Sequence, residues 1–432
     1  MRLVERDGEI EALSRTLAGA ATGSGAGVAV TGEPGAGKTA LVESAVAGAT
    51  GLRVLRSGCD PLATPRPLGP FRDLAAELGP ADPENVYSAL RERPTVLVVE
   101  DLHWIDEASA DMLRFLVRRL ETMACALIVT YRNDEIGPRH SARPLLGDFA
   151  ALDHVTTIRL APLTVAGVAD LIGRAAGRET GGGRDDAARV HAVTGGNPFF
   201  VAEVAKEPRR PLPETVRDAV LARTAGVGPG DFEVLQLAAA APDRLDDRVL
   251  PALGVDLPTL RRLHDTGLLL RNLRGLVFRH ELARLAVEST IPAGGAAHLH
   301  ARLLDALETV EPRDPAVLTH HAVAAADARR AARHAQDAAD QAAQAGAHTE
   351  AVAFLQIGLA HLDGGSPGER ARRLHMLAYE QYMTSRLESA IGSVTVTFPL
   401  WRAAGDAAGL SAAHESCAIF EYYNARRRAA ED

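Results

Sequence analysis

The chain has 432 residues, of which 47% are hydrophobic and 24% charged, and its formal net charge at pH 7 is −9. The length allows two to four domains with a large core, the negative charge disfavours a nucleic-acid-binding surface over the whole chain, and no apolar run reaches the roughly 18 residues of a membrane span. Three scattered cysteines show no metal-ligand spacing and no signal peptide is visible, so we expect a cytoplasmic protein without membrane contact.

Residues 1–160 alternate short apolar runs with stretches that suit amphipathic helices. The runs fall at residues 28–30, 54–55, 96–99 and 126–129, and a further strand is expected at 156–160. Fully apolar strands that alternate with helices imply a parallel sheet covered on both faces. We therefore predict an α/β domain with a parallel sheet over residues 1–163.

A glycine-rich segment follows the first apolar run and reads Gly32-Glu33-Pro34-Gly35-Ala36-Gly37-Lys38-Thr39. It matches the pattern G-x-x-x-x-G-K-[ST], and its lysine is one of only two in a chain with 45 arginines. Glycines let a backbone bend around phosphates, Lys38 can reach the β- and γ-phosphates, and the Thr39 hydroxyl can bind Mg²⁺. We predict that this loop, together with Ala40 at the start of the following helix, binds ATP or ADP, and that residues 1–163 form an α/β domain of the P-loop NTPase class. The alternative is a plain turn between a strand and a helix.

Two carboxylates, Glu100 and Asp101, follow the apolar run 96–99. Ligands of open α/β sheets bind at the carboxyl ends of the strands, so we expect these residues to complete a Mg²⁺ site with Thr39. One carboxylate would hold the metal and the other would polarise the attacking water. Their positions favour Glu100 as the metal partner and Asp101 as the water-directing residue, although the roles could be exchanged.

The next strand, at residues 126–130, is followed by Tyr131 and Arg132. A basic side chain at this strand end can contact the γ-phosphate, so Arg132 is a candidate catalytic residue. The alternative is an ordinary surface arginine.

Beyond residue 164 the strand signal fades. We expect a helical lid over 164–206, interrupted by the glycines 181–183, and then a proline-rich linker with Pro208, Pro211 and Pro213. Helical patterns and a small hairpin at 267–278 indicate a winged-helix-like domain over 207–312. Similar patterns at 345–352 and 384–391 indicate tetratricopeptide-like repeats over 313–432, with an ordinary helical domain as the alternative.

The segment Asp101-Leu-His103-Trp104-Ile-Asp106 resembles the "ED-x-H-W-x-D" signature of a bacterial ATPase family. That family belongs to the signal-transduction ATPases with numerous domains, whose best-known members are large LuxR-type transcriptional regulators. Four further segments resemble the family at residues 3–6, 59–70, 195–200 and 278–282, and Thr130-Tyr131-Arg132 resembles its sensor strand. The resemblance covers about residues 1–310 well and the helical remainder loosely.

The resemblance implies several further contacts with ATP or ADP. The segment with Val4 and Arg6 would lie beside adenine, Pro198 would pack near the nucleotide, and His280 would reach the phosphates in the resting state. Each of these residues also has a simpler alternative. Pro198 could be the first residue of a helix that Asn197 caps, and His280 could be a buried histidine with satisfied hydrogen bonds.

Other histidines of the chain have simpler explanations. His103 and Trp104 could be packing residues after the acidic strand. His298 and His300 lie on a predicted helix without metal partners, and we expect packing or surface roles for them.

The favoured hypothesis is a slowly hydrolysing ATP-dependent switch that responds to an inducer or regulatory protein at the helical repeats and self-associates with ATP bound. LuxR-type regulators end in a DNA-binding helix-turn-helix, but none is recognisable in residues 366–432, and residues 207–312 hold 13 arginines against 15 acidic residues. Either the chain is a fragment or shortened relative, or its output is not DNA binding, so direct DNA binding is not expected. The alternatives are a P-loop enzyme or motor with constitutive turnover, and a nucleotide-holding scaffold.

Overall fold

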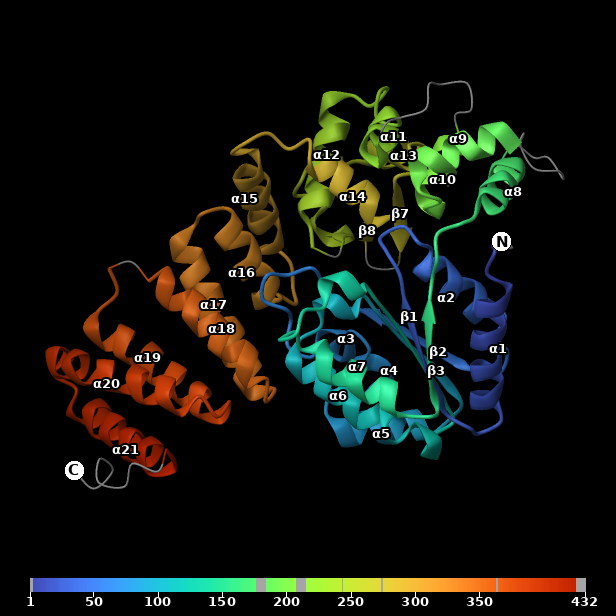
Figure 1. The fold of residues 1–432 in the computed structure, drawn as a ribbon. Helices are drawn as coiled ribbons and strands as arrows, with labels where there is room; N and C mark the ends of the chain where they lie inside the picture. Colours follow the sequence, from blue (N-terminus) through green and yellow to red (C-terminus); the bar gives the residue numbers. More distant parts are fainter. Residues whose placement is uncertain are drawn as a thin grey trace. The chain divides into compact units, whose positions relative to one another are not determined.

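The computed structural model describes residues 3–175, 184–206, 215–242, 244–272, 275–362 and 364–424 (Figure 1). The expected linkers at 181–183 and 208–213, and residues 273–274 of the expected hairpin, lie outside the described residues. The chain divides into two compact units. The first comprises Met1–Pro61, Gly69–Ile105 and Ser109–Ala293, and the second comprises Leu62–Leu68, Asp106–Ala108 and Gly294–Asp432.

A five-stranded parallel sheet forms the core of the first unit. Its strands are β1 (Ala26–Thr31), β2 (Arg53–Gly58), β3 (Thr95–Glu100), β4 (Cys125–Tyr131) and β5 (Val155–Arg159), in the order β2-β3-β4-β1-β5. Residues 95–99 of β3 are all buried. Because successive side chains of a strand point to opposite faces, both faces of the sheet are covered, as the apolar runs predicted.

The helices around this sheet are α1 (Asp7–Ala21), α2 (Lys38–Ala47), α3 (Gly69–Arg72), α4 (Ala75–Leu78), α5 (Pro83–Arg91), α6 (Glu107–Val117) and α7 (Ala142–Ala151), with 3-10 turns at Leu102–Trp104, Leu120–Thr122 and Asn133–Glu135. Leu13 and Leu17 of α1 and Leu41 of α2 share one buried core with Val28 and Val96 of the sheet. This core fixes the start of α2 against the carboxyl end of β1.

Three helices follow the sheet: α8 (Val165–Ala175), α9 (Arg184–Thr194) and α10 (Pro198–Lys206). They share a small apolar core in which Val168, Val190 and Val201 pack with Leu163 and with Val4 from the amino terminus. The chain thus forms the expected helical lid.

A second, antiparallel sheet lies among the following helices. Its strands are β6 (Leu245–Asp246), β7 (Leu269–Asn272) and β8 (Gly275–Phe278), in the order β6-β8-β7, and the helices are α11 (Val216–Ala222), α12 (Pro229–Ala240), α13 (Leu257–Asp265) and α14 (Glu281–Glu288), with a 3-10 turn at Asp247–Val249. Strands β7 and β8 pair as a hairpin, with Leu269 opposite Phe278. A three-stranded sheet among short helices is the arrangement expected for the winged-helix-like region.

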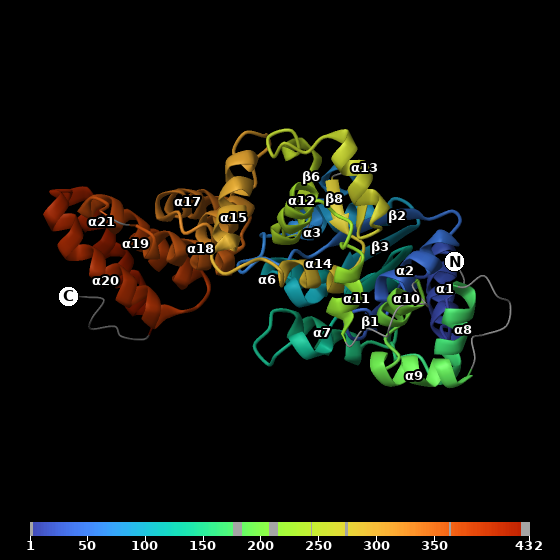
Figure 2. The ribbon, with the colours of Figure 1, turned by 90° about the horizontal axis from the view of Figure 1, so that it is seen from above.

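The second unit consists mainly of helices, each of which packs against the next (Figure 2). They are α15 (Gly295–Leu307), α16 (Pro315–Ala324), α17 (Ala328–Gln344), α18 (His348–Ala360), α19 (Pro367–Met383), α20 (Leu387–Ala404) and α21 (Ala407–Tyr423). Ala351 of α18 and Ala390 of α20, the matching positions of the two similar sequence patterns, are both completely buried. Small buried residues let neighbouring helices approach closely, which gives the stacked, tetratricopeptide-like arrangement.

One expectation for the second unit is wrong. The sequence offered no metal partner for His300, but the structure brings His320 and His321 of the neighbouring helix within ligand distance of it. His298 is exposed. No helix in the described part of the chain is long and apolar enough to cross a membrane.

Candidate nucleotide-binding site

The glycine-rich loop joins the end of β1 to the start of α2. Gly35 and Gly37 have φ angles of +79° and +93°, which only glycine adopts readily, and Gly37 is the residue that caps α2. The loop therefore curls in front of the amino end of a ten-residue helix. Free N–H groups at a helix start and the positive end of the helix dipole favour a bound phosphate there.

Lys38 lies within this loop rather than on the surface. Its side chain is buried, and its Nζ donates to the carbonyl oxygens of Gly32, at 2.7 Å, and Glu33, at 3.1 Å. Burial lowers the pKa of Lys38, and the nearby Asp101 carboxylate opposes this shift. The loop therefore holds the ammonium group of Lys38 in place. A bound phosphate chain would replace the carbonyl oxygens as the hydrogen-bond acceptors of this group.

Glu100 lies beside Thr39, as the metal-site prediction requires. The Thr39 hydroxyl donates to Glu100 Oε1 at 3.0 Å, and the second carboxylate oxygen accepts from Arg56 Nε at 2.7 Å. Arg56, on β2, also pairs with Glu43 of α2 at 3.1 Å. Sequence reasoning missed Arg56, because only the placement of β2 next to β3 brings it to the carboxylate.

Asp101 has an unusual backbone as well as an unusual side chain. Its φ of +59° is rare for a residue other than glycine, and its N–H donates to the Thr130 hydroxyl at 3.0 Å. Burial of the carboxylate and the neighbouring Glu100 charge raise the pKa of Asp101 to about 6, although Arg132 and Lys38 act in the opposite direction. A carboxylate with a raised pKa accepts a proton more readily, which suits a group that polarises water.

Arg132 is buried, which excludes the alternative of an ordinary surface arginine. One of its terminal nitrogens contacts Glu135 at 2.6 Å, and its guanidinium lies 5.4 Å from the centre of the Trp104 ring. The Nε atom has no hydrogen-bond partner among the described residues. The guanidinium lies close enough to Lys38 and Asp101 for its charge to lower the pKa values of both.

His103 fills the space between these groups. Its ring packs against Trp104 with 4.4 Å between the centroids, and its Nε2 lies 3.7 Å from Glu135 and 4.0 Å from Asp101. Burial, with the positive charges of Arg132 and Lys38, lowers the pKa of His103 to about 3. The ring is therefore neutral, and its contacts with the two carboxylates are not ion pairs.

The lid contacts the glycine-rich loop through the start of α10. Asn197 donates from Nδ2 to the Pro34 carbonyl at 2.8 Å, and its Oδ1 accepts from the backbone N–H groups of Phe199 and Phe200. The Phe199 N–H also donates to the Gly35 carbonyl at 3.2 Å. Pro198 is the first residue of this helix with Asn197 as its cap, as the simpler alternative had it, and the cap itself touches the loop.

The winged-helix-like region reaches the same loop through α14. A Cβ atom built on Gly35 would lie 2.8 Å from Leu282 Cδ1 and 2.7 Å from Asn197 Oδ1. Leu282 and Asn197 thus leave room only for glycine at position 35. His280, which precedes α14, is exposed, and its ring packs on Phe199 with 4.4 Å between centroids. The alternative of a fully buried histidine does not hold.

Val4 and Arg6 lie with the lid. Val4 is buried in the apolar core of α8, α9 and α10, and Arg6 donates to the Ala161 carbonyl at 2.6 Å. Arg6 also lies 4.0 Å from Glu9 of α1. The structure therefore groups Lys38, Thr39, Glu100, Asp101 and Arg132 in one site and places Val4 and Arg6 beside the lid core.

The oxygen atoms near Thr39 fit a hard divalent cation. A hydroxyl and two carboxylates are ligands that Mg²⁺ prefers, and it usually completes its shell with water and substrate phosphates. Thr39, Glu100 and Asp101 are the residues that would hold the ion. The adjacent loop, helix start and Lys38 supply the contacts that a triphosphate needs.

Comparison with known proteins agrees with this geometry. Residues 2–129 match the model of the AAA ATPase domain. The amino-terminal part of the chain is therefore similar to an AAA ATPase domain. The matched residues contain the glycine-rich loop, Glu100 and Asp101. A comparison of the sequence with curated proteins gives no match.

The fold as a whole resembles a signal transduction ATPase with numerous domains (STAND) that carries a tetratricopeptide repeat sensor, from Pyrococcus horikoshii. The TM-score is 0.53 at 14% identity, over 95% of this chain and 67% of that chain. A Walker-type ATPase of Pyrococcus abyssi, at 9% identity over 66% of this chain and 96% of that one, and the RuvB branch migration motor of Thermotoga maritima, at 19% identity over 64% and 92%, give TM-scores of 0.34, too low to support an argument. The likeness to the STAND protein is therefore one of fold, over the sheet-containing part and the helices that follow it.

Proposed function

We propose that this protein is a slowly hydrolysing, ATP-dependent regulatory switch, the sensor and ATPase part of a LuxR-type regulator. The observation that carries the proposal is the double contact on the glycine-rich loop, by Asn197 of the lid and by Leu282 of α14. A constitutive enzyme needs its phosphate-binding loop open to exchange. Two later segments that close on the loop suit a protein that retains its nucleotide.

In this proposal the chain has four parts: an ATPase domain at residues 1–163, a lid at 164–206, a winged-helix-like domain at 207–312 and repeats at 313–432. The loop and Lys38 bind the phosphates, and Thr39 and Glu100 hold Mg²⁺, which neutralises phosphate charge when bound. Asp101 orients the attacking water, and Arg132 exchanges Glu135 for the γ-phosphate. Val4 and Arg6 lie beside the adenine, Pro198 packs near the nucleotide, and His280 reaches the phosphates in the resting state.

The switch works through a difference in contacts between two nucleotide states. With ADP bound, Asn197 and Leu282 remain on the loop. An inducer or regulatory protein at the repeats favours the open state, ATP replaces ADP, and the chain self-associates. Hydrolysis restores the closed state.

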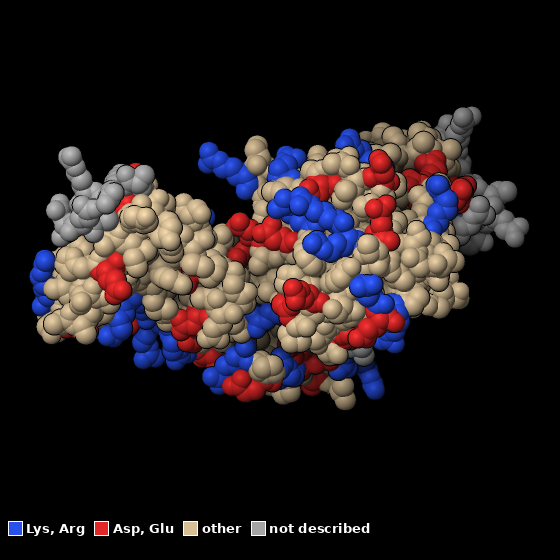
Figure 3. All heavy atoms as spheres, turned by 90° about the horizontal axis from the view of Figure 1, so that it is seen from below, with Lys and Arg blue, Asp and Glu red and all other residues tan. Residues whose placement is uncertain are grey.

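We propose an output other than direct DNA contact by this chain. On the face drawn in Figure 3, basic and acidic side chains are intermixed. DNA affinity needs clustered positive charge, and the net charge of −9 is unfavourable for it.

The test compares nucleotide binding and turnover of purified protein with two lysine variants. Lys38→Ala removes the contact with the phosphates and should abolish ADP binding measured by calorimetry. Lys206→Ala is the matched control, because Lys206 is the other lysine of the chain and pairs with Glu203 on α10. Slow turnover with retained ADP in wild type and the control supports the switch. Rapid turnover without any partner, or unchanged binding in Lys38→Ala, contradicts it.

A further inference from the structure

Three histidine rings meet between α15 and α16 of the second unit. His300 comes from α15, and the adjacent residues His320 and His321 come from α16. The ring centroids are 5.0 to 5.4 Å apart. One ring nitrogen from each residue lies within 4.8 Å of the others, and the Nδ1 atoms of His300 and His321 are 2.8 Å apart.

These rings are withdrawn from water. His321 is 1% exposed, and His300 and His320 are half-buried. Burial disfavours a charged imidazole, and a neutral imidazole offers a nitrogen lone pair to a metal.

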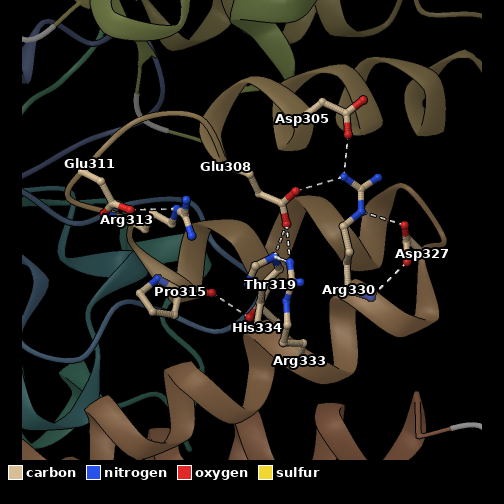
Figure 4. Close-up of polar contacts among 10 residues, drawn as sticks. All are labelled: Asp305, Glu308, Glu311, Arg313, Pro315, Thr319, Asp327, Arg330, Arg333 and His334. Atoms are coloured by element: carbon tan, nitrogen blue, oxygen red, sulfur yellow. Dashed lines mark hydrogen bonds and ion pairs between the residues drawn. The ribbon is translucent and has the colours of Figure 1, made fainter.

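The backbone that carries the rings is held in place on both sides. Leu304 of α15 packs with Leu318 and Ala322 of α16 in a buried cluster. Glu308, just beyond α15, accepts from Arg333 and contacts His334 of α17 (Figure 4). These contacts hold α15, α16 and α17 together around the histidines.

A second group of contacts strengthens the same corner. Arg330 of α17 pairs with Asp305 of α15 at 2.5 Å and with Asp327 at 2.7 Å (Figure 4). The Thr319 hydroxyl, one residue before the histidine pair, donates to the Pro315 carbonyl at 2.7 Å. The helix turn that presents His320 and His321 is therefore well ordered.

We propose that His300, His320 and His321 form a binding site for a divalent transition metal ion, with Zn²⁺ as the preferred ion. Imidazole nitrogen is a ligand that suits zinc, and three protein ligands with a water in the fourth position are a common zinc arrangement. Tetrahedral zinc–nitrogen bonds of about 2.0–2.1 Å place the ligand nitrogens about 3.4 Å apart. The Nδ1 atoms of His300 and His321, now 2.8 Å apart, would therefore move slightly apart, and the His320 nitrogen would move closer to them. The ion replaces the hydrogen bond between the Nδ1 atoms of His300 and His321.

The alternative is that the three rings pack and hydrogen-bond without any ion. Both arrangements give the ring nitrogens of His300 and His321 a partner, so a metal-binding experiment is needed to distinguish them. A bound ion links the first two helices of the second unit and stabilises the folded state by mass action. The nucleotide site does not enter into this proposal.

The test uses the 432-residue chain, stripped of metal by a chelator, without nucleotide and with excess Mg²⁺ to occupy the oxygen ligands near Thr39. Zn²⁺ is titrated in competition with a chromophoric chelator. We expect one equivalent to bind in wild type and the affinity to fall at least tenfold in His320→Gln. His298→Gln is the matched control, because His298 is an exposed histidine on the same helix as His300, and it should bind like wild type.

Two further measurements keep the proposal testable if His320→Gln does not fold. His300→Gln should lose the same equivalent, and Co²⁺ in the wild type should give the visible absorption of a four-coordinate ion. Zn²⁺ should also raise the unfolding temperature of wild type and of His298→Gln. Wild-type affinity in the folded His320 or His300 variant, or no stoichiometric binding by wild type, would overturn the proposal.

Discussion

Glu100 is shared between the Thr39 hydroxyl on one carboxylate oxygen and the Arg56 guanidinium on the other. Arg56 aligns the carboxylate and balances its charge, so Glu100 is positioned before any metal arrives. The hydrogen bond from Thr39 to Glu100 connects α2 with β3 at the carboxyl edge of the sheet. This link supports Thr39 and Glu100 as metal partners and leaves Asp101, whose pKa is raised to about 6, as the candidate for the water.

Thr39→Ala should raise the Mg²⁺ concentration needed for half-maximal ATP hydrolysis by roughly tenfold or more, the range found when ligand support is removed from metal sites. The variant loses the hydroxyl that binds both Glu100 and the ion. Thr39→Ser, which keeps the hydroxyl, is the control and should stay close to wild type. Equal Mg²⁺ dependence in all three proteins would show that Thr39 is not a metal partner.

Glu350 of α18 is a buried acid in the second unit. Its Oε1 accepts from the Glu107 N–H at 2.8 Å, while Oε2 has no hydrogen-bond partner in the described part of the chain. Burial, together with the Asp106 charge, raises the pKa of Glu350 from 4.5 to about 7. Since the folded-state pKa exceeds the unfolded one, the folded state binds more protons between these values, and stability falls as the pH rises from about 4.5 through 7.

Glu350→Gln should therefore remove part of this pH dependence. An ionised Glu350 costs on the order of 3 kcal/mol above pH 7, because each pKa unit corresponds to about 1.4 kcal/mol. Thermal unfolding should show the variant several degrees more stable than wild type at pH 8 and similar to it at pH 5. Glu415→Gln, at an exposed position of α21, is the control. A variant that is less stable at pH 8 would mean that the charge of Glu350 is stabilising.

At the scale of elements, α10 and α14 reach the same glycine of the phosphate-binding loop. Asn197 binds the loop through polar contacts at Pro34, whereas Leu282 meets Gly35 through an apolar one. Neither element belongs to the sheet, so both can leave the loop without disturbing the core. This arrangement allows the state of the loop to depend on the lid and the winged-helix-like region.

Leu282→Ala should speed ADP release by roughly tenfold, because truncating a half-buried leucine costs about 1–1.5 kcal/mol. Stopped-flow displacement of a fluorescent ADP analogue measures the rate. Leu285→Ala, on the same helix but 40% exposed, is the control and should release ADP like wild type. Unchanged release in Leu282→Ala would remove α14 from the mechanism.

Local patterns were enough to predict the sheet, the glycine-rich loop and the acidic strand end. Lys38, Thr39, Glu100 and Asp101 follow from short motifs whose residues lie next to the strands they depend on. Arg56 could not be found in this way, because its contact with Glu100 depends on the order of the strands. Leu282 could not be found either, because it lies more than 200 residues from Gly35 in the chain. His320 and His321 were missed for the same reason, because their partner His300 lies on another helix.

Over the whole chain, a part that is similar to an AAA ATPase domain is followed by helices α8 to α10, a small antiparallel sheet with its helices, and a stack of helices. The likeness to the STAND protein of Pyrococcus horikoshii extends over 95% of the chain, at 14% identity. Because each repeat helix packs against its neighbours, a ligand on the stack can act on several helices at once.

If the closed loop retains ADP, the protein should release ADP more slowly than it hydrolyses ATP. Both rates can be measured in the wild-type protein without any partner. Single-turnover quenched flow gives the rate of ATP hydrolysis, and stopped flow gives the rate of ADP release. We expect ADP release to be the slower step and to limit steady-state turnover. ADP release much faster than hydrolysis, with sustained turnover, would contradict the switch and indicate a constitutive ATPase.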